Sequence, residues 1–329
     1  MLLLALSACG RSTRNTPERI SVWTVPAPAM SDSVAARFRS GESYPGLGML
    51  IALDSASLRP EIVRRGGSGV VESRVSDSVW AVIHLDRPVT VTTYQGGRYH
   101  PETIRALSND SSVMATAATS IVRTGRFSRL ILDFQGGTTG DIQGLVNAVR
   151  AIRDADMRLG TRSLAVVVPW GDTVAYPTVP LSRVANILVI RLHGEHRPGT
   201  APGPLATPDF IARAIGIRAR LIGASRLGAE LPLFGYLWNR DGSVRLVTYA
   251  DAQSRVRAES AVFTRDPVSS FLTARGRDGW TIWVPDARTV QAMALEVKRR
   301  GVAWIALAGP EGADPAIFTP EGQTTIRSF

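Results

Sequence analysis

The feature that most constrains this fold is a repeated alternation of short apolar segments with amphipathic helical segments. From about residue 79, β-rich runs and helical patterns follow one another toward the C-terminus. The segment 164–168 is apolar throughout and ends at Pro169. Strands of this kind are buried on both faces, which is typical of a parallel sheet covered by helices.

The predicted strands share this β-rich, apolar character and lie at residues 79–83, 89–94, 130–134, 164–168, 187–190, 230–236 and 302–307, with further candidates at 22–25 and 49–53. Helical patterns lie between them, at residues 101–104, 113–122, 142–152 and 290–297. Thr207-Pro208 begins another helix, and Gly301 is typical of a helix C-cap.

Repeated strand-then-helix units over this length favour an α/β fold, a (β/α)8 TIM barrel over residues 20–329. Residues 240–283 are less regular and predict a small α+β insertion between strands 7 and 8. The sequence contains no GxGxxG or GxxxxGK[ST] motif, which disfavours a nucleotide-binding open sheet.

The charge of the chain is strongly positive, at +10 with a pI near 10.8. All but one of the 38 basic residues are arginine, Lys298 being the exception, and they are scattered. This favours the codon usage of a GC-rich genome over a nucleic-acid partner, with a basic surface for anionic envelope polymers as the alternative. One cysteine and four histidines leave few metal ligands, so we expect no metal site and no cofactor.

The N-terminus has the pattern of a processing segment, in which apolar residues 2–6 and small residues precede Cys9. Residues 6–9 resemble the lipobox of bacterial lipoproteins. The resemblance implies a signal at residues 1–9, lipidation of Cys9, a tether at residues 10–19 and a lipid-anchored protein of the bacterial cell envelope. A frayed apolar N-terminus with an incidental cysteine is the alternative.

In a (β/α)8 barrel the working residues lie at the carboxyl ends of the strands and in the loops that follow. Aromatic residues at or near the predicted strand ends are Tyr94, Trp170, Tyr236, Trp238 and Trp304. Sugar rings stack on flat aromatic surfaces, so these side chains are candidates for glycan contacts. Packing in the core is the alternative for each of them.

Residues 127–135 resemble the fourth-strand motif DGxDxDxE of glycoside hydrolase family 18, the chitinase-like barrels. Asp133 falls at the third Asp of that motif and Gln135 at the catalytic Glu. Further segments resemble later parts of the chitinase-like and spore-cortex-lytic branches, in the same order, at residues 164–169, 193–204, 234–238, 283–287 and 301–315.

The resemblance implies a substrate-assisted mechanism in which the Glu donates a proton and a sixth-strand Tyr, here His193, contacts the N-acetyl group. The amide of Gln135 has no proton to donate near neutral pH. We therefore expect a protein that binds an N-acetylhexosamine glycan, peptidoglycan or a chitin-like oligosaccharide, without hydrolysing it. Its expected ligand-binding residues are Tyr94, His193, Tyr236, Trp238 and Trp304.

Three alternatives stay open. Glu195 is a candidate relocated acid, which would make the protein an active, atypical glycosidase. His193, Glu195 and His196 are separated by few residues and could be metal ligands. The barrel could also be a non-catalytic scaffold of the cell envelope, with Asp133 and Gln135 bonded only to each other and to nearby loops.

Overall fold

The computed structural model describes residues 21–25, 44–45, 47–53, 60–64, 80–85, 129–133, 139–159, 163–302, 304–309, 312–319, 321–322 and 326. The predicted strand at residues 89–94 and the predicted helices at 101–104 and 113–122 lie outside these ranges.

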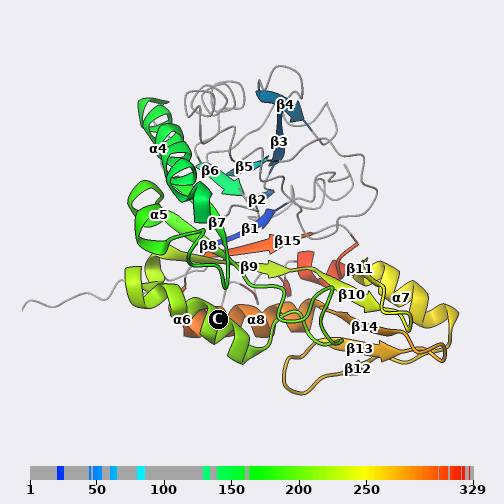
Figure 1. Ribbon diagram of the computed structural model, residues 1–329. Coiled ribbons are helices and arrows are strands. Elements are labelled where there is room, and N and C mark those ends of the chain that lie inside the picture. The colour runs from blue at the N-terminus through cyan, green and yellow to red at the C-terminus, as the bar shows by residue number, and fades with distance from the viewer. Residues whose placement is uncertain are drawn as a thin grey trace, which may run out of the picture.

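The core of the described part is a sheet in which eight parallel strands follow chain order around a barrel (Figure 1). They are β1 (Ser21–Val25), β3 (Leu47–Leu53), β5 (Trp80–Leu85), β6 (Arg129–Asp133), β7 (Ser163–Pro169), β8 (Ile187–Arg191), β9 (Leu227–Pro232) and β15 (Trp304–Ala308). The last strand, β15, pairs in parallel with the first, β1. Among the described residues no pairing joins β1 to β3; instead β2 (Tyr44–Pro45) flanks β1, and β4 (Pro60–Arg64) pairs antiparallel with β3.

This strand order confirms the predicted (β/α)8 barrel, and the candidates at 22–25 and 49–53 correspond to its first two strands. The described barrel helices are α4 (Ile142–Leu159), α5 (Thr178–Val184), α6 (Pro208–Ile222) and α8 (Ala287–Arg299). Short 3-10 turns occur at Thr139–Asp141, Ala224–Arg226 and Pro315–Phe318. No helix in the described ranges is both long enough and apolar enough to cross a bilayer.

Three of these barrel helices, α4, α6 and α8, form where the sequence predicts a helix, whereas α5 was not predicted. Leu145, Val149 and Ile152 of α4 are at most 2% exposed. The Thr207 side chain caps α6 by accepting a hydrogen bond from the backbone of Phe210. Gly301 ends α8 with a φ of +79°, and the 5→2 and 6→1 hydrogen bonds around it form a Schellman motif.

The alternating residues of the strands have different surroundings. Val166, Leu188 and Leu231 pack in the large core beneath the helices. Their neighbours Val167 and Val189 belong to a separate small cluster inside the barrel. Side chains alternate along a strand, so this pattern defines which residues face the interior.

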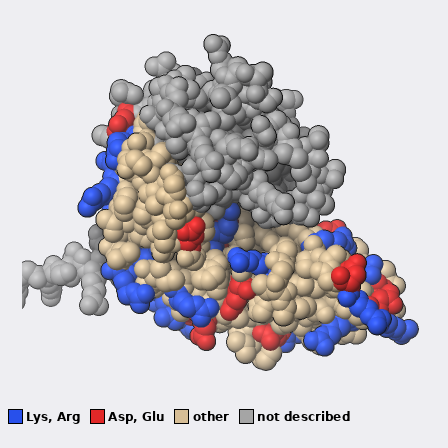
Figure 2. Space-filling model, in the orientation of Figure 1, with Lys and Arg blue, Asp and Glu red and all other residues tan. Residues whose placement is uncertain are grey.

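The α+β insertion follows the seventh strand, as predicted, and forms a lobe beside the barrel (Figure 1). In the same orientation, the surface of this lobe carries both basic and acidic side chains (Figure 2). In the described part its antiparallel sheet has the order β11-β10-β14-β13-β12. Its elements are β10 (Phe234–Trp238), β11 (Val244–Thr248), α7 (Tyr249–Ala258), β12 (Thr264–Arg265), β13 (Leu272–Arg275) and β14 (Thr281–Val284).

The single strand predicted at residues 230–236 is in fact two strands, β9 and β10, that belong to different sheets. The chain changes sheet after Pro232, where the Leu233 N–H still donates to the barrel at Ala308 O. Gly235 then allows β10 to approach β14, since a Cβ at Gly235 would lie 2.0 Å from the Trp283 carbonyl oxygen. The insertion sheet packs one face under α7, and its other face joins the barrel core.

Candidate functional site

The carboxyl ends of the parallel strands meet at one end of the barrel, which we call the mouth. Asp133 is the last residue of β6 and pairs with His84 of β5. Arg191 ends β8 at the same end. Gln135, Tyr94 and Cys9, which the sequence also singles out, lie outside the described residues.

A polar cluster at the mouth joins β8 and β9. The Glu230 side chain is 1% exposed, and its Oε1 accepts a hydrogen bond of 2.8 Å from Arg191 Nε. His193 Nε2 lies 3.2 Å from the same oxygen. A carboxylate oxygen can only accept, so this contact assigns the proton to Nε2.

Glu230 faces the barrel interior, because Ala229 and Leu231 on either side of it pack with the helices. A buried carboxylate costs several kcal/mol unless it is paired and hydrogen-bonded. The sequence analysis missed Glu230. The available signal was one charged residue inside an otherwise apolar strand, Leu-Gly-Ala-Glu-Leu-Pro.

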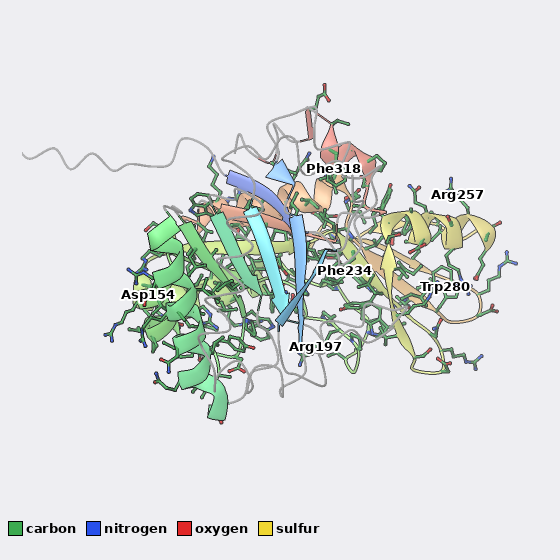
Figure 3. The ribbon with its side chains drawn as sticks, turned by 90° about the horizontal axis from the view of Figure 1, so that it is seen from above. Asp154, Arg197, Phe234, Arg257, Trp280 and Phe318 are labelled. Atoms are coloured by element: carbon green, nitrogen blue, oxygen red, sulfur yellow. The ribbon has the colours of Figure 1, made fainter. Side chains whose placement is uncertain are left out.

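An aromatic ladder continues from the polar cluster onto the insertion, and consists of His193, Phe234, Tyr236 and Trp238. Successive rings meet edge to face, with centroids 5.2, 6.0 and 5.7 Å apart. The three β10 residues are spaced two apart along the strand and therefore share one face. In Figure 3 Phe234 lies where the barrel strands meet the insertion, whereas Trp280 and Arg257 lie out on the insertion.

Tyr236 and Trp238, predicted as ligand-binding residues, are each 5% exposed. Trp238 Nε1 donates to Thr200 O at 3.2 Å, so the loop after β8 covers this end of the ladder. Burial raises the pKa of Tyr236, while the nearby charges of Arg191 and Arg197 act to lower it. The ladder is thus packed, and its Tyr236 hydroxyl lies in the field of two arginines.

Glu195, the candidate relocated acid, is bonded at the start of α6. Its Oε2 accepts from Thr207 N at 2.6 Å, and its Oε1 accepts from Thr207 Oγ1 at 3.0 Å. The backbone N–H groups of Gly194 and Glu195 both donate to Leu205 O at 3.1 Å. These bonds close the base of the loop, which gives the Glu195 carboxylate a positioning role there.

The three residues considered as metal ligands have separate partners. His193 contacts Glu230, Glu195 contacts Thr207, and His196 Nδ1 lies 2.9 Å from Ala201 O. In the described part of the chain no three His, Cys, Asp or Glu residues converge on a common point.

Trp304, also predicted as a ligand-binding residue, is the first residue of β15. It therefore lies at the amino end of the strand, opposite the mouth, and packs against the interior cluster that contains Val167 and Val189. Trp170 follows β7 at the mouth and meets Phe210 edge to face at 4.9 Å. On the insertion, Trp283 of β14 pairs with Tyr236 and is only partly buried.

Arg218 of α6 fixes the rim next to Trp170. It is fully buried and donates hydrogen bonds of 2.8–2.9 Å, to Tyr176 O, Thr178 Oγ1, Pro169 O and Asp172 O. Burial lowers the pKa of Arg218 to about 10, against an opposing effect of the Asp172 carboxylate. The guanidinium stays charged at neutral pH and holds the loop after β7.

The strand order, the outer helices and the antiparallel insertion after the seventh strand define a (β/α)8 barrel with an α+β insertion. No protein-family model and no curated protein matches the chain. The evidence for the fold comes from solved structures.

A chitinase from Chromobacterium violaceum ATCC 12472 is similar, with a TM-score of 0.76 at 18% sequence identity, over 93% of this chain and 98% of that chain. The Bacillus cereus spore cortex-lytic enzyme SleL gives a TM-score of 0.71 at 12% identity, over 93% of this chain and 74% of that chain. A class V chitinase from Nicotiana tobaccum, a Glu-to-Gln mutant in complex with NAG4, gives a TM-score of 0.69 at 14% identity, over 94% of this chain and 100% of that chain. The chitinase-like fold predicted from the sequence is confirmed.

Proposed function

We propose that this protein binds an N-acetylhexosamine glycan at the mouth of the barrel and does not hydrolyse it. The observation that carries the proposal is the polar cluster of Glu230, Arg191 and His193, which meets the aromatic ladder at the functional end of a chitinase-like barrel. Hydrogen-bond donors beside aromatic surfaces are what a sugar site requires.

The absence of hydrolysis rests on the sequence, where Gln135 stands at the motif position of the proton-donating Glu. A Glu-to-Gln mutant of the similar class V chitinase is described in complex with NAG4. Such a replacement is therefore compatible with glycan binding in a barrel of this type. The alternative is an active glycosidase. In that case the Glu195 carboxylate would first have to break its two hydrogen bonds with Thr207 before it could donate a proton.

The test is calorimetric titration with an N-acetylglucosamine tetramer, combined with analysis of the sugar for cleavage. We expect saturable binding, no cleavage, and a loss of binding in His193→Ala. His196→Ala in the same loop is the matched control, because its imidazole bonds only within the loop in the contacts described above. Cleavage that disappears in Glu195→Gln would support the active glycosidase instead.

The burial of the aromatic ladder favours a second candidate, a scaffold barrel whose cleft is filled by its own side chains. On this view neither the tetramer nor peptidoglycan fragments bind, and Trp238→Ala changes stability alone. The same titrations therefore separate the two candidates.

We further propose that the protein is exported and held at the bacterial cell envelope by a lipid on Cys9. The support is the lipobox-like sequence at residues 6–9. Mass spectrometry of the mature N-terminus tests this, since a diacylated Cys9 is expected, and an unprocessed Met1 would contradict it.

A further inference from the structure

The amino end of the barrel, opposite the mouth, carries basic side chains at the ends of successive helices. The helices α5, α6 and α8 each end a few residues before the next barrel strand begins, so their C-termini lie at this end. Their last turns contain basic residues, as does the 3-10 turn that leads into β9. Together with the residue that caps α8 they form the basic face, which consists of Arg183, Arg220, Arg226, Lys298, Arg299 and Arg300.

The elements that carry the basic face touch one another. The Arg226 side chain donates to the carbonyl oxygens of Ser182 and Ala185 at the end of α5. A Cβ on Gly301, just after α8, would lie 3.5 Å from the Cβ of Ala224, in the same turn as Arg226. Figure 2 shows basic side chains gathered at the left of the described part, where Figure 1 places α5 and the end of α6. The charges therefore add up over one continuous surface.

The positive charge of the basic face is only partly balanced. All six of its side chains are exposed or half-buried. In the described residues of these helix ends the one carboxylate is Glu296, which is buried and lies 2.6 Å from Arg300 and 3.7 Å from Arg299. On the adjacent α4, exposed Arg153 stands beside exposed Asp154, so the excess of positive charge ends there.

A basic residue in the last turn of a helix also interacts favourably with the helix dipole. That effect acts within each helix and explains a single arginine, but it does not require an exposed apolar neighbour. Leu221 follows Arg220 in the last turn of α6 and is 58% exposed. Apolar side chains among basic ones are typical of protein surfaces that lie against a membrane interface.

The chain enters the barrel at the same end. Ser21, the first residue of β1, pairs with Trp304, the first residue of β15. Residues 10–20 separate Cys9 from this point, and these eleven residues span at most about 40 Å when fully extended. A lipid on Cys9 would therefore hold the amino end of the barrel close to the bilayer.

We propose that the basic face docks on the anionic phospholipid headgroups of the membrane and directs the mouth of the barrel away from the bilayer. The inference rests on the proposed lipid anchor at Cys9 and is independent of glycan binding. An acyl chain and a basic surface together hold a protein on a membrane more firmly than either does alone. Each basic residue close to an anionic leaflet favours binding about fivefold, so three of them contribute about 100-fold.

The experiment measures sedimentation of the full chain with vesicles of phosphatidylglycerol and phosphatidylcholine, at about 0.1 M salt. All proteins carry Cys9→Ser, so that no lipid contributes to binding. The test variant replaces three exposed arginines of the basic face, by Arg183→Gln, Arg220→Gln and Arg299→Gln. The matched control removes the same charge from exposed positions of the insertion, by Arg240→Gln, Arg257→Gln and Arg277→Gln.

We expect the test variant to bind the vesicles about 100-fold more weakly. The control should lose less than about fivefold, because salt screens charges that lie far from the bilayer. Binding should also weaken as the salt concentration rises. Melting temperatures establish that each variant is folded. If the triple variant does not fold, Arg220→Gln and Arg299→Gln alone decide, since each should weaken binding about fivefold.

Four results would overturn the inference. They are no binding to anionic vesicles, equal binding to vesicles of phosphatidylcholine alone, equal losses in the test variant and the control, and binding to soluble polygalacturonate in place of vesicles. The last result would assign the basic face to an anionic polymer. None of them bears on the lipid anchor itself, because these chains carry no lipid and mass spectrometry of the mature N-terminus decides that proposal separately.

Discussion

Replacing Arg218 by methionine tests whether the rim of the mouth depends on one buried guanidinium. Arg218 donates four hydrogen bonds of 2.8–2.9 Å. Three of them go to backbone carbonyls, one at the end of β7 and two in the β7–α5 loop. Methionine has a similar length and is apolar, so the substitution removes the donors while leaving little cavity.

The expected loss follows from the energies of such bonds. A hydrogen bond to a charged group is worth about 1.5–3 kcal/mol, and a carbonyl left buried without a donor adds a penalty of its own. The cost of burying the guanidinium, several kcal/mol, offsets much of this gain in the wild type. We expect Arg218→Met to lower the free energy of unfolding by about 3–5 kcal/mol, as for the loss of one partner of a buried pair.

Urea unfolding followed by tryptophan fluorescence measures this change, and Trp170 beside the loop adds a local signal. Arg226→Met is the matched control, because Arg226 also donates to backbone carbonyls, of Ser182 and Ala185, yet is exposed. We expect Arg226→Met to cost no more than about 1 kcal/mol. Equal effects of the two substitutions, or a loss below about 1 kcal/mol for Arg218→Met, would refute the argument.

Three further substitutions test the described contacts. Glu195→Ala removes the acceptor for Thr207 N and should destabilise the protein by about 1–2 kcal/mol in urea unfolding; an unchanged stability would show that the bond is dispensable. Gly235→Ala should prevent folding or cost more than about 3 kcal/mol, because its Cβ would meet a backbone oxygen of β14; a soluble variant of normal melting temperature would disprove the close approach. Burial acts to raise the pKa of Asp286, but bonds from Arg265 and Thr289 outweigh it and leave the pKa below its ordinary value. The stability that Asp286 contributes is therefore present above its unfolded pKa and is lost as the pH falls through the lower pKa of the folded state. The melting temperature of Asp286→Asn should accordingly fall less between pH 7 and pH 3 than the melting temperature of wild type.

In the described part of the chain, the barrel strands and the helices α4, α6 and α8 were predictable because their signals are local, whereas the short helix α5 was missed. An apolar segment such as 164–168 is expected to be a strand buried on both faces. The apolar face of α4 follows from the helical spacing of its buried residues. The cap at Gly301 follows from the ability of glycine to adopt a positive φ. The boundary between β9 and β10 was not predictable, because apolar residues continue across Pro232 and only tertiary pairing reveals the change of sheet.

The polar contacts at the mouth could not be predicted in the same way. Arg191 and Glu230 are 39 residues apart, and their ion pair depends on the register of two strands. Arg218 reads in sequence like any exposed arginine of a helix, although it is buried by a loop more than 40 residues earlier. The sequence made Glu195 a candidate general acid, because nothing in it indicates the hydrogen bonds to Thr207. These bonds become evident only in the folded loop.

The most direct test of the account is a titration of the wild-type protein with the N-acetylglucosamine tetramer, in which the recovered sugar is analysed by mass spectrometry. The account predicts saturable binding and an intact tetramer after prolonged incubation. Shorter products from the wild type, or no detectable binding at millimolar sugar, would contradict it.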